Sequence, residues 1–476
     1  MDEFDAALSR AREHALAFLS ALDERSVAAT ISAADLRARL DGPLPQAGVE
    51  PARVVDELVA DTEGGHLGSA GGRFFGWVIG GPLPAALASD WLVSTWDNNA
   101  AIHASGPAVS VVEEVAGAWI KEILDLPRDA SFAFTTGCQM AHFTGLAAAR
   151  NAVLAARGWD VEARGLAGGP AIRVLATEHR HGTVDRALRQ LGLGTDCMVA
   201  LPTDADSRLT PEVLGRALGD SDAPTIVVLD AADLNVGAFD PFEALAPLAR
   251  SAGAWTHVDG AFGLWARASR RHKDKTLGID LADSWATDAH KWLNTPKDIG
   301  VAVVRDRKAH QAAMGLQASY IVRAADGARD AMDFTPDWTR RPRGVPVYAV
   351  LRELGREGVE ALIDRCCDFA DALAAGIGDL DGAELVGGRP SLNQAIVRFL
   401  DPRPGASDAD HDAFTLRMIA AINAEGTAFF SAGMWRGRRT MRISVVGART
   451  TAEDIRLTVA AVSRVLAAER AALQSA

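Results

Sequence analysis

The chain has 476 residues, 48% of them apolar, and carries a formal net charge of −13. This length and composition predict a fully folded protein of two or three domains, and the acidic balance disfavours nucleic acid or an anionic membrane as the main partner. No stretch is apolar enough to span a membrane, residues 1–30 lack the apolar core of a signal peptide, and the four cysteines form no C-x-x-C pair, so we expect a cytoplasmic protein without structural zinc.

The N-terminal end is expected to be helical. Residues 2–22 carry apolar side chains at helical spacing, and residues 51–65 form a second amphipathic pattern that ends at two glycines. A break rich in proline and glycine, 41–51, separates the two patterns. We therefore assign residues 1–70 to an N-terminal helical segment.

From about residue 130 the chain changes to short β-branched runs that alternate with amphipathic helices. This alternation indicates an α/β domain with a mostly parallel sheet covered on both faces, and we assign residues 71–344 to it. The expected strands are 173–178, 225–231, 254–261, 284–290 and 300–306. Ligands of such sheets bind at the carboxyl ends of the strands, so polar residues there are the first candidates for a site.

The last part of the chain, residues 345–476, predicts a smaller α+β domain. A long helical region is interrupted at Gly355 and Gly358, half-buried strands are expected at 395–400 and 440–445, and a helix over 451–473 follows. This order of helix, strands and helix differs from the regular alternation before it, which sets the region apart as a separate domain.

Lysine is an uncommon residue in this chain, which has six lysines among its 49 basic residues. Lys291 follows an apolar strand in the segment TDAHKW. Burial there lowers the pKa of a lysine and frees its amine to form a Schiff base. The alternative is a lysine whose ammonium group reaches the solvent, which is the commoner case for a single residue. The nearby Lys297 lies in the turn sequence NTPKDIG and is expected to be exposed.

Asp259 directly follows another apolar strand, in the segment HVDGAFG. A carboxylate at that place is partly desolvated and requires a cationic partner, such as a protonated ring nitrogen. The alternative is that Asp259 caps the N-terminus of the next helix.

Two further strand ends offer groups that suit a phosphorylated aromatic ligand. In FTTGCQMAHFTG a strand runs through Gly137 into a long helix, whose first N–H groups could bind phosphate, although neither the Walker A nor the G-x-G-x-x-G pattern is present. In ATEHRHGTVDRA, His179 and His181 could stack on a ring or transfer protons, and a metal site is less favoured because it lacks a third ligand. Together with Lys291 and Asp259, these groups suit pyridoxal 5'-phosphate, whose ring is an electron sink when a carboxylate keeps its nitrogen protonated.

Several of these segments resemble a known family. HVDGAFG, ADSWATDAHKWLN, HGTVDRA, NVGAFDPF and RFFGWVIGG are similar to segments of the group II pyridoxal-phosphate decarboxylases, the family of aromatic amino acid, glutamate and histidine decarboxylases. The resemblance covers roughly residues 65–455. It implies the aminotransferase-like fold (fold type I) with a mostly parallel seven-stranded sheet, a homodimer with shared active sites, and a carboxy-lyase that converts an L-amino acid to an amine and CO2.

The same resemblance implies roles for individual residues. Lys291 forms the internal aldimine, and the reaction passes through a quinonoid intermediate. Asp259 pairs with the pyridinium and His181 stacks on the ring, which makes these three the expected catalytic residues. The other expected cofactor-binding residues are Gly137, Cys138, Gln139 and His290 around the phosphate and Ala261 against the ring. Asp288 stands where relatives often have Asn, and we give it no role because a carboxylate repels phosphate.

The chain departs from that family in its mobile loop. Many members carry a loop tyrosine that protonates the product carbon, whereas the matching region here, 318–344, has Phe334 or Trp338 nearest to that position. Neither side chain donates a hydroxyl proton. The two tyrosines, Tyr320 and Tyr348, lie at or beyond the edges of the loop.

Three outcomes of the reaction therefore stay open. Another acid, such as His181, could complete the decarboxylation to an amine. Oxygen could instead convert the intermediate to an aldehyde by decarboxylation-dependent oxidative deamination, or the chain could catalyse transamination. A degenerate scaffold protein that only binds the cofactor is the non-enzyme alternative, and the presence of Lys291, Asp259 and His181 speaks against it.

The substrate residues are the least determined part of the site. Trp77, Trp96 and His103 suit an apolar or aromatic side chain, as does Phe334, but packing at a dimer interface favours the same residue types. Arginines for an acidic substrate are also available. We expect a small-molecule substrate that is an amino acid, and no metal ion.

Overall fold

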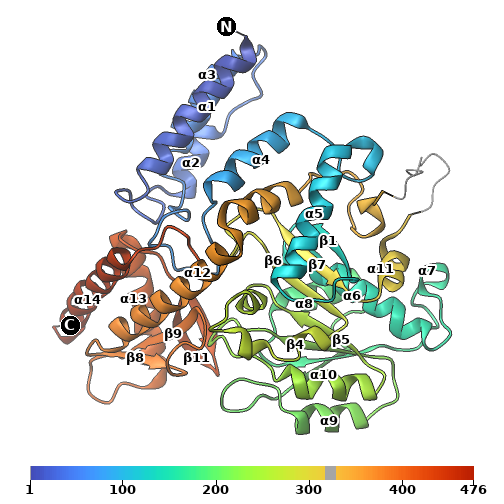
Figure 1. The fold of residues 1–476 in the computed structure, drawn as a ribbon. Helices are drawn as coiled ribbons and strands as arrows, with labels where there is room; N and C mark the ends of the chain where they lie inside the picture. The colour runs from blue at the N-terminus through green and yellow to red at the C-terminus, as the bar shows by residue number, and fades with distance from the viewer. Residues whose placement is uncertain (1, 317–327, 476) are drawn as a thin grey trace. The chain divides into compact units, whose positions relative to one another are not determined.

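A computed structural model describes residues 2–316 and 328–475. The chain divides into two compact units (Figure 1): unit 1 comprises Met1–Ile79, Asp371–Gly388 and Ile396–Ala476, and unit 2 comprises Gly80–Ala370 and Arg389–Ala395. The N-terminal helices thus belong to the same unit as the C-terminal strands, whereas the sequence-based division sets them apart. The domain boundaries at 70 and 344 stay a prediction. Among the described helices, none has both the length and the apolar character that a membrane span requires.

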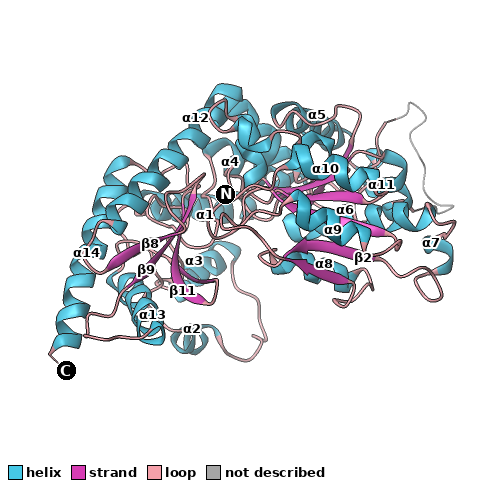
Figure 2. Ribbon diagram, turned by 90° about the horizontal axis from the view of Figure 1, so that it is seen from below, coloured by secondary structure: helices cyan, strands magenta, loops and turns pink. Residues whose placement is uncertain are grey.

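Unit 2 is built on a seven-stranded sheet (Figure 2). In spatial order its strands are β1 (Ser131–Thr135), β7 (Gly300–Val304), β6 (Ser284–Asp288), β5 (Trp255–Asp259), β4 (Thr225–Asp230), β2 (Arg173–Thr177) and β3 (Met198–Leu201). Only β7 runs antiparallel to its neighbours in this sheet, and every residue of β1 and of β4 to β7 is buried. The predicted α/β fold with a mostly parallel sheet is confirmed. Strand β3 was not predicted, since half of its residues are exposed and its run is short.

Strand register brings the polar strand ends to one edge of the sheet. Asp230 of β4 pairs with Asp259 of β5, and Asp259 pairs with Ala286, two residues before Asp288 ends β6. Strand β1 is antiparallel to β7, which is antiparallel to β6, so β1 also ends at this edge. Helix α6 (Cys138–Ala155) begins there and packs against β5, β6 and β7.

The other helices of unit 2 surround this sheet. They are α4 (Pro84–Trp96), α5 (Pro107–Ile123), α7 (Val161–Arg164), α8 (Gly182–Gln190), α9 (Pro211–Gly219), α10 (Phe242–Ser251), α11 (Arg307–Met314) and the first part of α12 (Gly344–Gly378). Short 3-10 turns are η1 (His103–Ser105), η2 (Gly263–Ala268), η3 (Lys273–Thr276), η4 (Ile279–Leu281) and η5 (Ala331–Asp333).

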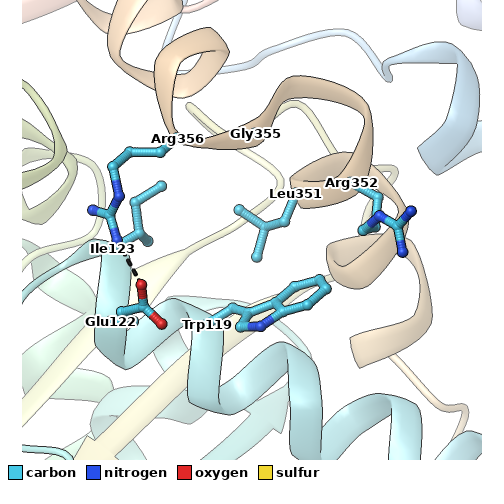
Figure 3. Close-up of a pocket in the computed structure, with 7 residues that line it drawn as sticks. All are labelled: Trp119, Glu122, Ile123, Leu351, Arg352, Gly355 and Arg356. Atoms are coloured by element: carbon cyan, nitrogen blue, oxygen red, sulfur yellow. Dashed lines mark hydrogen bonds and ion pairs between the residues drawn. The ribbon is translucent and has the colours of Figure 1, made fainter.

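The predicted interruption of α12 is confirmed at Gly355 and is wrong at Gly358, which has helical backbone. The φ of 61° and ψ of −177° at Gly355 are open to glycine and unfavourable for other residues, so the helix breaks there. The break lines a pocket of about 320 Å³ together with Trp119 and Leu351, and Arg356 reaches Glu122 of α5 at 2.8 Å beside it (Figure 3).

Unit 1 combines three N-terminal helices with a smaller antiparallel sheet. The helices are α1 (Glu3–Ser20), α2 (Ala33–Leu40) and α3 (Pro51–Thr62), and the C-terminal helices are α13 (Asp408–Glu425) and α14 (Ala452–Gln474). The sheet has the order β10 (Ser431–Trp435), β11 (Arg438–Ser444), β9 (Gln394–Phe399) and β8 (Ala383–Val386). A buried ion pair of 3.1 Å joins Arg73 to Asp454 of α14, so Arg73 serves this unit's core.

Candidate active site

The turn between β1 and α6 brings backbone N–H groups to the carboxyl edge of the sheet. Gly137 has a φ of 99°, and a Cβ atom there would lie 3.3 Å from Cε1 of His290. Gly300 has no side chain for a related reason, since a Cβ atom on it would lie 2.3 Å from the carbonyl carbon of Gly137. The two glycines therefore let the turn, β7 and the His290 segment approach one another closely.

Asp288, which ends β6, occupies the N-terminus of α6. Its Oδ1 accepts a hydrogen bond of 2.6 Å from the backbone N–H of Cys138, and its Oδ2 lies 3.1 Å from Nζ of Lys291. The side chain is buried, and Nδ1 of His290 lies 3.6 Å from Oδ1. Helix N-termini attract anions, so the Asp288 carboxylate stands where the sequence predicts phosphate. Sequence reasoning left this residue without a role.

Lys291 is partly buried beside this carboxylate. Burial lowers its pKa, but the carboxylates of Asp288 and Asp259 and the hydrogen bond to Asp288 outweigh burial, so the pKa lies above its ordinary value. The expectation that burial alone would free the amine is therefore wrong for this chain. The reason is Asp288, three residues earlier in the chain. The sequence did not reveal that its carboxylate points at the amine of Lys291.

His290 lies between the glycine turn and β7. Its Nδ1 is 3.0 Å from the carbonyl oxygen and 3.2 Å from the amide nitrogen of Ile299. Burial lowers the pKa of His290, although Asp288 raises it. The neutral imidazole is thus held against the backbone and next to Gly137.

Asp259 is a buried carboxylate at the end of β5. Its Oδ1 accepts a hydrogen bond of 3.1 Å from the N–H of Ala261, and its Oδ2 lies 3.4 Å from Nε2 of His142. Burial raises the pKa of Asp259, but His142, His181 and Lys291 together hold it well below its usual range. The carboxylate is therefore ionised and faces the Lys291 side of the site.

Ala261 joins the ends of β5 and β6. Its carbonyl oxygen accepts a hydrogen bond of 3.0 Å from the N–H of Asp288, and its side chain packs against an apolar cluster. The cluster consists of Ala133, Cys138, Ala141, Ala286, Ala302 and Phe334. Small side chains at this place leave room above the strand ends.

His181 stands at the start of α8 as its N-cap. Nδ1 accepts a hydrogen bond of 3.3 Å from the N–H of Thr183 and lies 2.7 Å from its hydroxyl oxygen. An Nδ1 that accepts this bond places the ring proton on Nε2. The imidazole of His181 is exposed in the single chain, and it contributes to the lowered pKa of Asp259.

Other predicted residues lie around this cluster or apart from it. Gln139 donates its side-chain amide to Gln190 at 2.6 Å. Trp96 ends α4 and is 49% exposed. His103 donates its backbone N–H to Asp330 at 2.9 Å.

Trp77 and Phe334 sit in apolar surroundings. Trp77 belongs to unit 1, where its ring packs against Phe74 and Phe429. Phe334 is buried, and its carbonyl oxygen accepts a hydrogen bond of 2.8 Å from Nε2 of His310. Residues 318–327 of the predicted loop, with Tyr320, lie outside the described residues, and Tyr348 stacks on Trp119.

Sequence reasoning also missed two buried histidines. His142 on α6 and His257 on β5 are fully buried, with 2.9 Å between Nδ1 and Nε2. One signal was available, because His257 precedes Asp259 by two residues and so shares its face of the strand. The ligand atoms of Cys138, His142 and Asp259 lie within 4.8 Å of one another, a set that suits a metal ion by residue type. The expectation of no metal stays a prediction.

These residues fit pyridoxal 5'-phosphate. Asp259 is a buried carboxylate at hydrogen-bonding distance from a backbone N–H and near a histidine, and a ring N–H⁺ would complete its partners. The space that a Cβ atom of Gly137 would fill lies between the α6 turn and His290, and Lys291 stands beside it. Among the described residues at this turn, Asp288 is the one that opposes a phosphate.

Comparison with known proteins agrees with this chemistry. The model of the pyridoxal-dependent decarboxylase conserved domain matches residues 73–397. L-2,4-diaminobutyrate decarboxylase of Rhizobium meliloti (strain 1021) is 30% identical over 377 residues, which cover 78% of this chain and 73% of that protein. Aromatic-L-amino-acid decarboxylase of Bacillus atrophaeus is 25% identical over 442 residues, 91% of this chain and 89% of that protein. The crystal structure of Oryza sativa TDC with PLP and tryptamine has the same fold, with a TM-score of 0.91, 22% identity and 98% of each chain covered.

Proposed function

The chain belongs to the family of pyridoxal-dependent decarboxylases, enzymes that remove the carboxyl group of an amino acid, and from this premise we propose that Lys291, Asp259 and His181 carry its chemistry. The observation that supports this most is the meeting of a lysine, a buried ionised carboxylate and a helix N-terminus at one sheet edge. When bound, pyridoxal 5'-phosphate takes up the amino group of the substrate and delocalises the electron pair that the leaving CO2 releases.

Three side chains have different roles at the cofactor ring. Lys291 would hold the cofactor through Nζ and would move protons at that atom. Asp259 would accept a hydrogen bond from the ring nitrogen and keep the proton there, because its own pKa is low. His181 would cover one face of the ring, and its Nε2 would be the atom that donates a proton to the product, since Thr183 engages Nδ1. This assignment leads to an amine as product.

The phosphate end is assigned to the α6 turn. Gly137, Cys138 and Gln139 contribute the turn and the first N–H groups of the helix, and His290 closes the side that faces Gly137. Asp288 accepts a hydrogen bond from the Cys138 N–H, so it would compete with a phosphate for that group and would limit how strongly the cofactor binds. Ala261 leaves space for the ring.

We further infer a homodimer that shares its active sites, located in the cytoplasm. Large apolar side chains are exposed on α1 of unit 1 (Phe4, Leu8) and on α4 of unit 2 (Trp91, Trp96), which suits coverage by a second copy. The four cysteines are free thiols, as expected for a reducing compartment. The mass of the protein in solution, measured by sedimentation, tests the dimer.

The substrate is an L-amino acid whose side chain the two relatives help to narrow. Their names point to L-2,4-diaminobutyrate and to aromatic amino acids, and Trp77, Trp96, His103 and Phe334 are our candidates for contacts with the latter. Release of CO2 from a panel containing both classes, with amine, aldehyde and peroxide measured in parallel, identifies substrate and product together. Peroxide formed in step with CO2 would contradict the amine.

Reduction with borohydride tests the role of Lys291. We expect the reduced protein to carry the cofactor on the single peptide that contains Lys291, and Lys291→Ala to abolish the label. Lys297→Ala, which removes a lysine six residues away, is the matched control and should keep it. Labelling of another peptide in the wild-type protein would overturn the assignment.

A further inference from the structure

A chain of four buried side chains leads away from Asp259 into the core of unit 2. Nε2 of His142 lies 3.4 Å from Oδ2 of Asp259, and Nδ1 of His142 lies 2.9 Å from Nε2 of His257. Nδ1 of His257 lies 2.8 Å from Oγ of Ser284, which accepts a hydrogen bond of 2.9 Å from Nε1 of Trp255. His142, His257 and Ser284 are fully buried.

The backbone leaves room for this chain at one specific residue. A Cβ atom on Gly145 would lie 2.8 Å from Cε1 and 2.9 Å from Nδ1 of His257. Gly145 follows His142 by three residues on α6, so both positions are on the helix face that meets β5. Helix α6 therefore supplies one histidine and makes space for the other.

One direction of the hydrogen bonds satisfies the groups at both ends of this chain. The indole of Trp255 can only donate, so Ser284 accepts from it and has its own proton for Nδ1 of His257. When Nδ1 of His257 accepts this proton, the ring proton of His257 is on Nε2 and is donated to Nδ1 of His142. The proton of His142 is consequently on Nε2, which points at Asp259. The opposite direction would place a nitrogen lone pair against the carboxylate.

We propose that Trp255, Ser284, His257 and His142 act as a positioning relay that fixes the N–H of His142 on Asp259 and keeps this carboxylate ionised for the ring nitrogen of the cofactor. The proposal rests on the role of Asp259 in the proposed function. None of the four residues is assigned to the reacting atoms, so they act through Asp259.

Other titratable groups also face Asp259. They are Lys291 after β6, His181 before α8, Asp230 at the end of β4 and the thiol of Cys138 at the start of α6. Burial raises the pKa of the Cys138 thiol well above its usual value, so Cys138 is neutral. Its sulfur hydrogen-bonds with Nε2 of His142 at 3.5 Å, and the same nitrogen lies 3.4 Å from Oδ2 of Asp259. Within the described residues, His142 is the group at hydrogen-bonding range of Oδ2 that the relay controls.

The test compares two ligands of the full-length protein from which the cofactor has been removed. One is pyridoxal 5'-phosphate, and the other is its 1-deaza analogue, in which a C–H group replaces the ring nitrogen. The ratio of their dissociation constants measures the interaction of the ring nitrogen with Asp259. A substitution that only disturbs the structure weakens the binding of both ligands alike, and the ratio of their dissociation constants stays unchanged.

We expect His142→Phe to reduce this ratio about tenfold and Ser284→Ala about threefold, because a hydrogen bond to a charged group is lost or loosened. Ser131→Ala is the matched control. Ser131 is also a buried serine at 2.8 Å from Nδ1 of a buried histidine, His310, but that histidine bonds to the carbonyl oxygen of Phe334 and not to Asp259. Ser131→Ala should therefore leave the ratio of the two dissociation constants as it is in the wild-type protein.

The outcomes separate the relay from the role of Asp259. If the wild-type protein does not discriminate between the two ligands, the assignment of Asp259 fails and the relay with it. If the wild-type protein discriminates and Ser284→Ala retains the full ratio, the relay alone is overturned. Should His142→Phe fail to fold, Ser284→Ala still decides the question, since it removes one oxygen at the far end of the chain.

Histidine tautomers give a second readout that requires no cofactor. In protein with 15N-labelled histidine, we expect His142 and His257 each to carry the proton on Nε2, with the signals assigned from His142→Phe and His257→Gln. Ser284→Ala should shift His257 towards a mixture of tautomers. A proton on Nδ1 of His142 in the wild-type protein would contradict the proposed direction.

Discussion

Asp259 and Asp288 end neighbouring strands of the same sheet, both buried, yet their surroundings differ. Asp288 binds a helix N-terminus and the ammonium group of Lys291 within 3.1 Å. Asp259 faces a backbone N–H and a histidine that belongs to a buried chain. An Asp after an apolar strand thus has no fixed chemistry, because its charge is balanced by whatever the tertiary structure places opposite it.

We expect the largest effect on activity from the substitution of Asp259. Asp259→Asn removes the charge that holds the ring proton, so we expect kcat/KM for CO2 release to fall about a hundredfold or more. Asp288→Asn, the matched change one strand away, should cost less than tenfold. Equal losses in the two variants would show that the carboxylates do not differ in role.

Asp259 and His257 should affect the unfolding free energy in different ranges of acidic pH. Burial and the neighbouring His142 lower the pKa of His257 from 6.5 to about 3, so its neutral form contributes stability that is lost as the pH falls from 6.5 towards 3. Asp259, with a lowered pKa, contributes stability that is lost only below about pH 4. His257→Gln should therefore flatten the decline in unfolding free energy between pH 6.5 and 4, by up to about 1.4 kcal/mol per pH unit, whereas Asp259→Asn should not. Urea unfolding at several pH values measures both.

The absence of a side chain at Gly145 makes room for His257, and its contribution to stability can be measured. Gly145→Ala places a Cβ atom 2.8 Å from the imidazole, and we expect about 2 kcal/mol of lost stability from overpacking. Gly215→Ala on α9 is the control, because its Cβ atom would meet only Leu248 at an ordinary 3.6 Å. Thermal unfolding of both variants gives the difference, and a neutral Gly145→Ala would mean that the ring can move.

The smallest effect concerns the pKa of Lys291. Asp288 raises this pKa more than Asp259 does, so Asp288→Asn should lower it by about one unit and Asp259→Asn by less. The amine then becomes reactive at lower pH. The pH profile of the rate at which the cofactor-free protein is labelled by pyridoxal phosphate and borohydride should move accordingly, and a profile moved to higher pH would contradict this.

The sequence by itself determined the residues with reactive groups and the fold that carries them. Apolar strands alternating with helices predicted the sheet, and the strand ends predicted where Lys291, Asp259 and Gly137 would lie, because these signals are local along the chain. The sequence even marked Asp288 as unusual for a phosphate site.

Only the tertiary structure decided how these groups act on one another. His142 and His257 are 115 residues apart in the chain and meet because α6 packs on β5, and Asp288 raises the pKa of Lys291 because β6 ends beneath the α6 turn. Likewise, Trp77 belongs to the unit that contains Phe429. Such contacts depend on strand register and helix packing between distant segments, and these are properties of the folded chain that no local pattern of residues encodes.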